Sequence, residues 1–297
     1  MSVKIAKNSG FCFGVKRAIN IALEAAQKHK KTVTLGPIIH NPQMVEKLNE
    51  KGILSVNDHS EIKGRATIIR SHGVEKNILE KLKNDDIEII NATCPYVSKT
   101  QEFAKQLGEE GYQVIILGDK DHPEVIALKS YTDGNAIIVS NANELPKQIS
   151  KKVGVISQTT RNIEDLQELV RALVPRCNDL KVINTICNAT AIRQEATLKL
   201  AKESDVMIVI GGKNSSNTKM LAKISAKIIE TYHIEIADEI DEKWFKGKCN
   251  IGLTAGASTP DWIIVEVYNK IIECLENDQN LAACIDDIPG FKEKNDV

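Results

Sequence analysis

The sequence is poor in several features that mark particular classes of protein. Aromatic residues make up only 4% of the 297 residues, which is a low share. No apolar run approaches the roughly 20 residues of a membrane-spanning helix. The net charge of −1 gives no general attraction to nucleic acid or to an anionic membrane, and the first residues carry lysines where a signal peptide needs an apolar stretch. We therefore expect a cytoplasmic protein that binds neither nucleic acid nor membrane.

The seven cysteines include no Cys-x-x-Cys pair, which excludes a conventional zinc ribbon or ferredoxin-type run. A disulfide framework is not expected in a reducing compartment, so each cysteine is a small buried residue, a metal ligand or a catalytic thiolate. Four of them fall outside the repeat described below, and for these we expect buried apolar positions: Cys177, Cys249, Cys274 and Cys284.

Short β-branched runs, each followed by an amphipathic stretch, recur along the chain. This alternation predicts α/β units with mainly parallel sheets. The clearest runs are 32–35, 66–69, 113–117, 153–156, 206–210 and 250–253.

The chain also contains an approximate threefold repeat, and a repeat changes the predicted architecture. Segments 90–94 and 183–187 match at an offset of 93 residues, and each is a strand followed by a turn that carries a cysteine. Residues 4–15 have the same order. A glycine follows each cysteine at a distance of 24 residues; the pairs are Cys12 and Gly36, Cys94 and Gly118, and Cys187 and Gly211. We therefore predict three similar α/β domains, at 1–94, 95–187 and 188–270, with a C-terminal extension at 271–297.

Polar residues occupy equivalent loop positions in the three units. One set, 28 residues after the cysteines, is His40, His122 and Ser215, and a later loop in each unit supplies His72, Thr159 and Ser258. Loops at the carboxyl ends of parallel strands line the ligand crevice of an α/β sheet. If the three units pack around a pseudo-threefold axis, both sets and the three cysteines meet in one central cavity.

Three converging thiolates favour a soft or borderline metal. An iron–sulfur cluster held by three cysteines would keep one iron with an open position, and an open metal polarises a substrate oxygen. Zinc with three thiolates and a water is the alternative. The polar loops, including 211–218 after an apolar strand, predict an anion site, although they lack the order of a triphosphatase. Glu124 is either a proton donor or a residue that stabilises a helix start.

Five motifs together resemble one known family, that of 4-hydroxy-3-methylbut-2-enyl diphosphate reductases, the last enzymes of the non-mevalonate isoprenoid pathway. The resemblance runs from about residue 3 to 270, and the motifs are residues 10–15, 91–95, 157–160, 185–190 and 256–261. It implies three α/β domains around a central [4Fe–4S] cluster held by Cys12, Cys94 and Cys187. It also implies a reaction in which two electrons and two protons remove an allylic hydroxyl as water, giving isopentenyl diphosphate and dimethylallyl diphosphate.

The resemblance also implies roles for individual residues. Thr159 contacts the substrate hydroxyl, Glu124 donates protons through a local network that includes His122, and the open iron binds the hydroxyl oxygen. A ferredoxin or flavodoxin is implied as the electron donor. The residues implied to bind the substrate are His40, His72, His122, Thr159, Ser215, Ser216, Asn217 and Ser258.

Three other functions fit some of the same features. A redox-neutral dehydratase would use the open iron without any electron partner, and would therefore consume substrate without a reductant. A non-enzymatic iron–sulfur sensor would pair its cluster with a basic or helix-turn-helix surface, of which the sequence shows no pattern. A zinc hydrolase would be colourless and contain zinc instead of iron.

Overall fold

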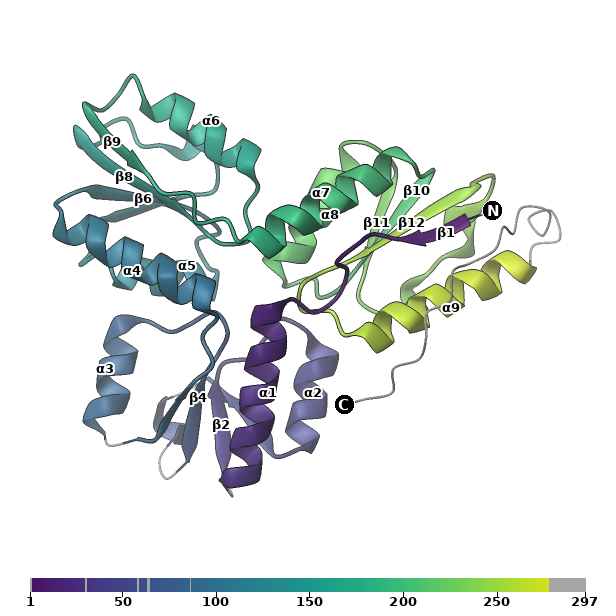
Figure 1. Cartoon of the computed structure of the whole chain (residues 1–297), viewed down its shortest axis with the longest axis horizontal. Helices are drawn as coiled ribbons and strands as arrows, with labels where there is room; N and C mark the ends of the chain where they lie inside the picture. Colours follow the sequence, from purple (N-terminus) through teal and green to yellow (C-terminus); the bar gives the residue numbers. More distant parts are fainter. Residues whose placement is uncertain (1, 30, 58, 63–64, 86, 278–297) are drawn as a thin grey trace.

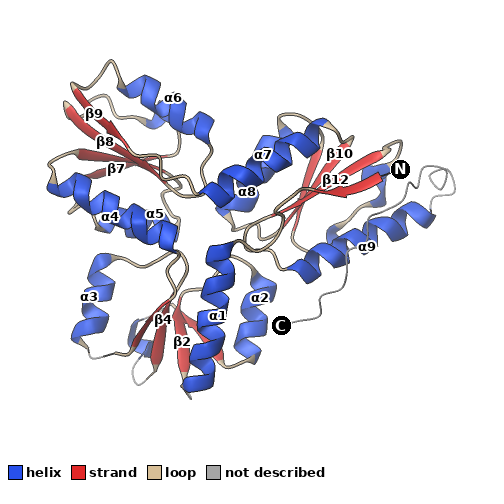
Figure 2. Cartoon of the chain, viewed as in Figure 1, coloured by secondary structure: helices blue, strands red, loops and turns tan. Residues whose placement is uncertain are grey.

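The computed structural model describes residues 2–29, 31–57, 59–62, 65–85 and 87–277 of the chain. In this part of the chain the strands form three four-stranded sheets, and every pairing within them is parallel. Figure 1 shows three lobes around a common middle, and Figure 2 shows helices on both faces of each sheet. The predicted α/β class with three similar parallel-sheet units is confirmed.

The first sheet has the strand order β3-β2-β4-β5. Its strands are β2 (Thr32–Leu35), β3 (Ile53–Val56), β4 (Ala66–Ile69) and β5 (Ile89–Asn91). The helices are α1 (Phe13–Lys28), α2 (Pro42–Glu50) and α3 (Lys76–Asn84), with a 3₁₀ turn at His59–Ile62. Helices α1 and α2 share one apolar core with the sheet, and α3 contributes to a second core on the other face.

The second sheet repeats this order as β7-β6-β8-β9. Its strands are β6 (Gln113–Leu117), β7 (Ala136–Val139), β8 (Lys152–Ser157) and β9 (Asp179–Val182). The helices are α4 (Pro95–Glu109), α5 (Pro123–Ser130) and α6 (Ile163–Leu173), with a 3₁₀ turn at Ala142–Glu144. Again two helices, α4 and α5, cover one face and the third covers the other.

The third sheet has the order β11-β10-β12-β1. Its strands are β10 (Val206–Ile210), β11 (Thr231–Ile234), β12 (Asn250–Ala255) and β1 (Ser2–Ile5). The helices are α7 (Asn188–Lys202), α8 (Ser216–Ala226) and α9 (Asp261–Asn277), with 3₁₀ turns at Ala237–Glu239 and Glu242–Phe245. Helix α9 packs in the largest core of this unit, opposite α7 and α8.

Strand β1 belongs to the sheet of the third unit, although it precedes the first cysteine. It pairs with β12 in the register Ser2 to Asn250 through Ile5 to Leu253. In the other units the equivalent edge strands are β5 and β9, and each of these runs into Cys94 or Cys187. Each sheet therefore ends in a strand that leads to the cysteine of the next unit, and β1 closes this circle by leading to Cys12.

Local sequence explains why the elements form where they do. The central strands β6 and β10 are β-branched or apolar along almost their whole length and are buried on both faces, as expected for parallel sheets. Helix α1 buries residues spaced three or four apart, and proline at the start of α2, α4 and α5 fits the first helical turn. Among the described residues, no helix is long and apolar enough to cross a membrane.

Candidate active site

The three repeat cysteines take the same structural position. Cys12, Cys94 and Cys187 are the N-cap residues of α1, α4 and α7, each with an extended backbone and no side-chain capping bond. Figure 1 shows these three helices starting near the middle of the molecule and running outward. All three cysteines line one cavity. The structure thus brings the three predicted thiols together.

The surroundings of the sulfur atoms suit thiolate ligands. A Cβ atom built on Gly14 would lie 2.5 Å from the Cys94 Sγ, so a side chain at this position would displace that sulfur. The backbone N–H groups of Tyr96 and Val97 lie near the Cys94 sulfur and lower the pKa of its thiol. Those of Ala189 and Thr190 do the same for Cys187.

Burial nevertheless raises the pKa of the Cys94 and Cys187 thiols, since it outweighs the effect of these amide groups. A metal deprotonates a coordinating thiol outright. Three free thiols at equivalent helix starts, with backbone N–H groups near two of the sulfurs, fit an iron–sulfur cluster bound through three cysteines.

The remaining cysteines agree only in part with the expected buried positions. Cys274 is buried in the core beside α9, as predicted. Cys177 is half-buried, and its thiol donates to the Leu173 carbonyl. The prediction for Cys249 is wrong, because this residue is exposed next to the start of β12. Cys284 lies outside the described residues.

Three histidines from two units form a cluster in the same cavity. His40 follows β2, His72 follows β4, and His122 is the N-cap of α5. The ring centroids lie 4.3 Å apart for His40 and His72, 5.2 Å for His40 and His122, and 5.4 Å for His72 and His122. Neither ring nitrogen of His40, nor Nδ1 of His72, has a hydrogen-bond partner although all three atoms are buried. Buried polar atoms without a partner are rare in folded proteins, and these three are available to hydrogen-bond to a ligand.

The histidines are neutral at pH 7. Burial lowers the pKa of His40 to about 4, and the positive charges of Arg70 and Lys219 act in the same direction. Burial likewise lowers the pKa of His122 to about 3. The N–H of Glu124 donates to Nδ1 of His122 at 3.1 Å, so the proton of the neutral ring resides on Nε2. His122 therefore presents a hydrogen-bond donor away from its own helix.

The nitrogens of the three histidines lie within 4.8 Å of one another and are close enough to hold a metal ion. The charges that act on them favour an anion instead. Arg70 and Lys219 act on both His40 and His122. These two cations would repel a bound metal and attract an anion such as a phosphate group.

Glu124 and Thr159 form a buried pair at the edge of this cavity. The Thr159 N–H and hydroxyl donate to the two carboxylate oxygens of Glu124, at 2.7 and 2.9 Å. Glu124 is 1% exposed, and burial raises its pKa to about 7 even though the two bonds from Thr159 lower it. A carboxyl group with this pKa is protonated in a large fraction of molecules near neutral pH, which suits a general acid.

The third unit contributes polar residues at the start of α8 and after β12. Ser215 caps α8 by accepting from the Thr218 N–H. Asn217 is buried, yet neither its Oδ1 nor its Nδ2 has a partner. The Ser258 hydroxyl donates to the His40 carbonyl at 3.0 Å, which joins the third unit to the first. All the residues predicted to bind substrate line the same cavity as the cysteines: His40, His72, His122, Thr159, Ser215, Ser216, Asn217 and Ser258.

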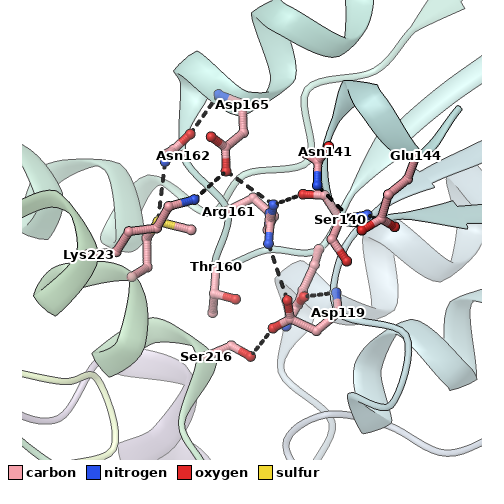
Figure 3. A network of polar contacts seen from close by, with 12 residues as sticks. Asp119, Ser140, Asn141, Glu144, Thr160, Arg161, Asn162, Asp165, Ser216 and Lys223 are labelled. Atoms are coloured by element: carbon pink, nitrogen blue, oxygen red, sulfur yellow. Dashed lines mark hydrogen bonds and ion pairs between the residues drawn. The ribbon is translucent and has the colours of Figure 1, made fainter.

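Ser216 is held in place by a polar network between the second and third units (Figure 3). Its hydroxyl donates to Asp119 at 2.6 Å. The other carboxylate oxygen of Asp119 pairs with Arg161 at 3.2 Å, and Arg161 also pairs with Asp165 at 3.1 Å. Lys223 of α8 lies 3.8 Å from Asp165 and forms a second link between the units. The network fixes the start of α8 against the second sheet.

Comparison with known proteins decides the family. The sequence matches the model of the LytB protein family over residues 3–272. The chain belongs to the LytB family. The resemblance to 4-hydroxy-3-methylbut-2-enyl diphosphate reductases that the motifs predicted is confirmed by this match together with the relatives described next.

Curated relatives of this LytB-family chain are named 4-hydroxy-3-methylbut-2-enyl diphosphate reductase. The protein of Geotalea uraniireducens is 48% identical over 284 residues, which cover 94% of this chain and 100% of that protein. The protein of Geobacter sulfurreducens is 48% identical over 277 residues, which cover 92% and 98%.

Two solved structures are also similar. One, of (E)-4-hydroxy-3-methyl-but-2-enyl diphosphate reductase, described as the terminal enzyme of the non-mevalonate pathway, is 45% identical with a TM-score of 0.66 over 92% of this chain and 100% of that one. The other, the E-1-hydroxy-2-methyl-but-2-enyl-4-diphosphate reductase of Plasmodium falciparum, is 29% identical with a TM-score of 0.85 over 93% and 88%.

The structure adds four charged residues to the LytB-family site that sequence reasoning missed. Arg70 and Lys219 act on the histidines, Asp119 holds Ser216, and Arg193 lines the cavity beside the cysteines. Of these four residues, Arg193 could have been found from the sequence repeat. At the offset of 93 residues Arg193 replaces Thr100, which puts a charge on a helix face that is otherwise uncharged and buried.

Proposed function

We propose that this chain catalyses the reductive removal of the allylic hydroxyl of 4-hydroxy-3-methylbut-2-enyl diphosphate. Two electrons and two protons enter: the hydroxyl leaves as water with one proton, and the allyl group takes the other proton and the electron pair. The products are isopentenyl diphosphate and dimethylallyl diphosphate. The observation that carries the proposal is the buried Glu124–Thr159 pair, which shares one cavity with three free cysteines and three histidines, two of which have buried ring nitrogens without a partner.

The histidine cluster and the start of α8 would bind the diphosphate. His122 offers its Nε2–H, and His40, His72 and Asn217 offer buried polar atoms that have no partner in the protein. Arg70 and Lys219 provide a positive field without occupying the site. Binding an anion there satisfies polar groups that are costly to leave unpaired.

The cysteines Cys12, Cys94 and Cys187 would hold the cofactor. When bound there, a [4Fe–4S] cluster would supply the electrons and, at its fourth iron, an open position for the hydroxyl oxygen of the substrate. The negative charge of Glu124 acts on Cys187, so the proposed proton donor lies close to one of the ligands.

Glu124 would move the protons. Its carboxyl group holds a proton near neutral pH because burial raises its pKa to about 7. Thr159 keeps that carboxyl in one orientation through two hydrogen bonds, and its hydroxyl would pass a proton from Glu124 to the substrate oxygen. His122 takes part by fixing the backbone of Glu124 through its Nδ1.

We further propose that a ferredoxin or flavodoxin delivers the electrons and that the protein works in the cytoplasm. The sequence contains no Gly-x-Gly-x-x-Gly fingerprint for a nicotinamide or flavin dinucleotide, which favours a separate carrier protein. Thiolate ligands keep their metal in a reducing compartment, which favours the cytoplasm.

The test is to purify the protein without oxygen, measure iron and colour, and assay the hydroxylated diphosphate with dithionite and methyl viologen. We expect brown protein with about four iron atoms per chain and products that form only with reductant. Equal substrate consumption without reductant would indicate a redox-neutral dehydratase. Colourless protein that contains zinc would indicate a hydrolase, and iron-loaded protein without turnover would overturn the proposed substrate.

A further inference from the structure

Arg193 of α7 is a cation that the fold encloses almost completely. The residue is 3% exposed and lines the cavity of the three cysteines. Its Nη2 donates to the Gly10 carbonyl at 2.8 Å, and its Nη1 to the Ala189 carbonyl at 3.3 Å. These two carbonyls flank Cys12 and Cys187, so the guanidinium lies between two of the three cysteine loops.

The charge of Arg193 has no carboxylate partner. Across the described ranges, no acidic side chain lies within ion-pair distance of it. Its Nε is also buried without a hydrogen-bond acceptor. Arg161, another buried arginine, differs from Arg193 in this respect, because its guanidinium forms ion pairs with both Asp119 and Asp165. A buried charge is costly unless it is paired.

Among the residues that the structure describes, the ionisable groups that act on Arg193 are Cys12 and Cys187. Both carry negative charge once they bind a metal as thiolates. A cluster with three thiolates has a net negative charge, and this charge grows by one unit when the cluster accepts an electron. An enclosed cation beside it therefore stabilises the reduced form more than the oxidised form.

We propose that Arg193 is the buried counter-cation of the iron–sulfur cluster and raises its reduction potential. This inference rests on the proposed function, because it requires the cluster. Arg193 is a positioning residue: it acts on the substrate only through the cluster. The orphaned Nε leaves one more donor available to a sulfur atom of that group.

The experiment measures the equilibrium reduction potential of the reconstituted cluster by a spectroscopic redox titration, at matched iron content. Arg193→Gln removes the charge but keeps an N–H donor, and Arg193→Lys keeps the charge but loses the planar fork. The matched control is Arg17→Met. Arg17 is only half-buried and donates to the Thr93 carbonyl, next to Cys94, so it joins a cysteine loop without being enclosed.

In Arg193→Gln we expect the ratio of reduced to oxidised cluster at a fixed potential to fall about tenfold, which is about 59 mV for a one-electron couple. Arg193→Lys and Arg17→Met should keep the wild-type potential. An unshifted Arg193→Gln potential would overturn the inference. So would an equal shift in Arg17→Met, because that result would assign the effect to loop geometry.

If Arg193→Gln takes up no iron, the reduction potential of Arg193→Lys tests the inference instead. A tenfold change in the ratio of reduced to oxidised cluster in Arg193→Lys would show that the planar guanidinium matters and the charge does not, and would overturn the inference. A wild-type potential in that variant would support the inference. These outcomes differ from failure of the proposed function. Wild-type protein that binds no iron would overturn the proposed function itself.

Discussion

Thr159 donates both its backbone N–H and its hydroxyl to the Glu124 carboxylate, at 2.7 and 2.9 Å. The two residues come from α5 and from the loop after β8, and both are buried away from bulk solvent. Hydrogen bonds to the charged form lower a carboxyl pKa, whereas burial raises it. Burial has the larger effect here and places the pKa near 7. This pair is the basis of the first two predictions.

Replacing Glu124 by Gln removes the ionisable group and keeps its shape. We expect turnover with dithionite to fall by roughly 10²–10⁴-fold, which is the usual contribution of one general acid. Iron content and substrate affinity should stay close to wild type. Glu110→Gln is the control, because Glu110 is a surface carboxylate paired with Lys181. Near-wild-type turnover of iron-loaded Glu124→Gln would show that another group donates the proton.

The raised pKa of Glu124 also predicts how stability depends on pH. Its pKa rises from 4.5 to about 7 on folding, so between these values the folded protein holds a proton that the unfolded chain has lost. The stability from this group is therefore complete below the unfolded pKa and is lost as pH rises through the folded one.

Compared with wild type, Glu124→Gln should gain stability as pH rises from about 5 to about 8, by up to about 3 kcal/mol. Urea unfolding of the metal-free proteins at the two pH values measures this difference. A constant difference between the proteins would contradict the buried neutral carboxyl.

Cys94→Ser should lose the cluster. Serine is a poor ligand for iron in such a site, and the two remaining thiolates would not hold a cluster that uses three. Iron per chain and the visible absorption after anaerobic reconstitution measure the effect. Cys249→Ser is the matched control because Cys249 is exposed and distant from the cavity lining, and it should load normally. A fully loaded and active Cys94→Ser would refute the ligand assignment.

Gly14→Ala should weaken cluster binding although alanine favours a helix by about 1 kcal/mol over glycine. The added Cβ would lie 2.5 Å from the Cys94 Sγ, so the sulfur must move. We expect lower iron content and faster loss of colour in air. The control is Gly108→Ala, near the end of α4, where the nearest atoms lie at 3.4 Å and the added methyl fits with little adjustment. Equal iron retention in both variants would count against the position of Cys94.

Anion binding should draw protons into the histidine cluster. His40 and His122 are neutral in the free protein because burial lowers their pKa to about 4 and about 3. A diphosphate beside them raises these pKa values, so the protein should take up protons on binding at about pH 6.5. Calorimetry of inorganic diphosphate in buffers of different ionisation enthalpy measures the uptake. No uptake, together with normal binding, would mean that the histidines act only as neutral donors.

The sequence was sufficient to predict the strands because their signal is local. The runs at 32–35, 66–69, 113–117 and 206–210 are the observed bounds of β2, β4, β6 and β10, and β8 and β12 extend slightly beyond their runs. The cysteine and histidine positions were predicted for a related reason. A repeat places equivalent loops at equivalent strand ends, and parallel strands bring those ends to one side of the sheet.

Other features depend on contacts between distant segments, which periodicity does not encode. Nothing in residues 2–5 indicates that β1 joins the sheet of the third unit. The charge of Lys219 acts on His40 only because the third unit packs against the first. The high pKa of Glu124 results from enclosure, whereas the sequence left open whether this residue donates a proton or stabilises a helix start. Cys249 was expected inside because cysteine is often buried, but it lies at the surface just before β12.

The position of β1 has a consequence for biosynthesis. Its partner β12 spans Asn250–Ala255, so the ribosome makes almost the whole chain before this strand can pair. Until then the backbone N–H and C=O groups of residues 2–5 have no strand to pair with, and the third sheet lacks one edge strand. Pairings across so long a stretch of chain form slowly. The strand that leads to Cys12 can therefore join its sheet only after β12 has been made, and a nascent chain released before then would lack the partner of that strand.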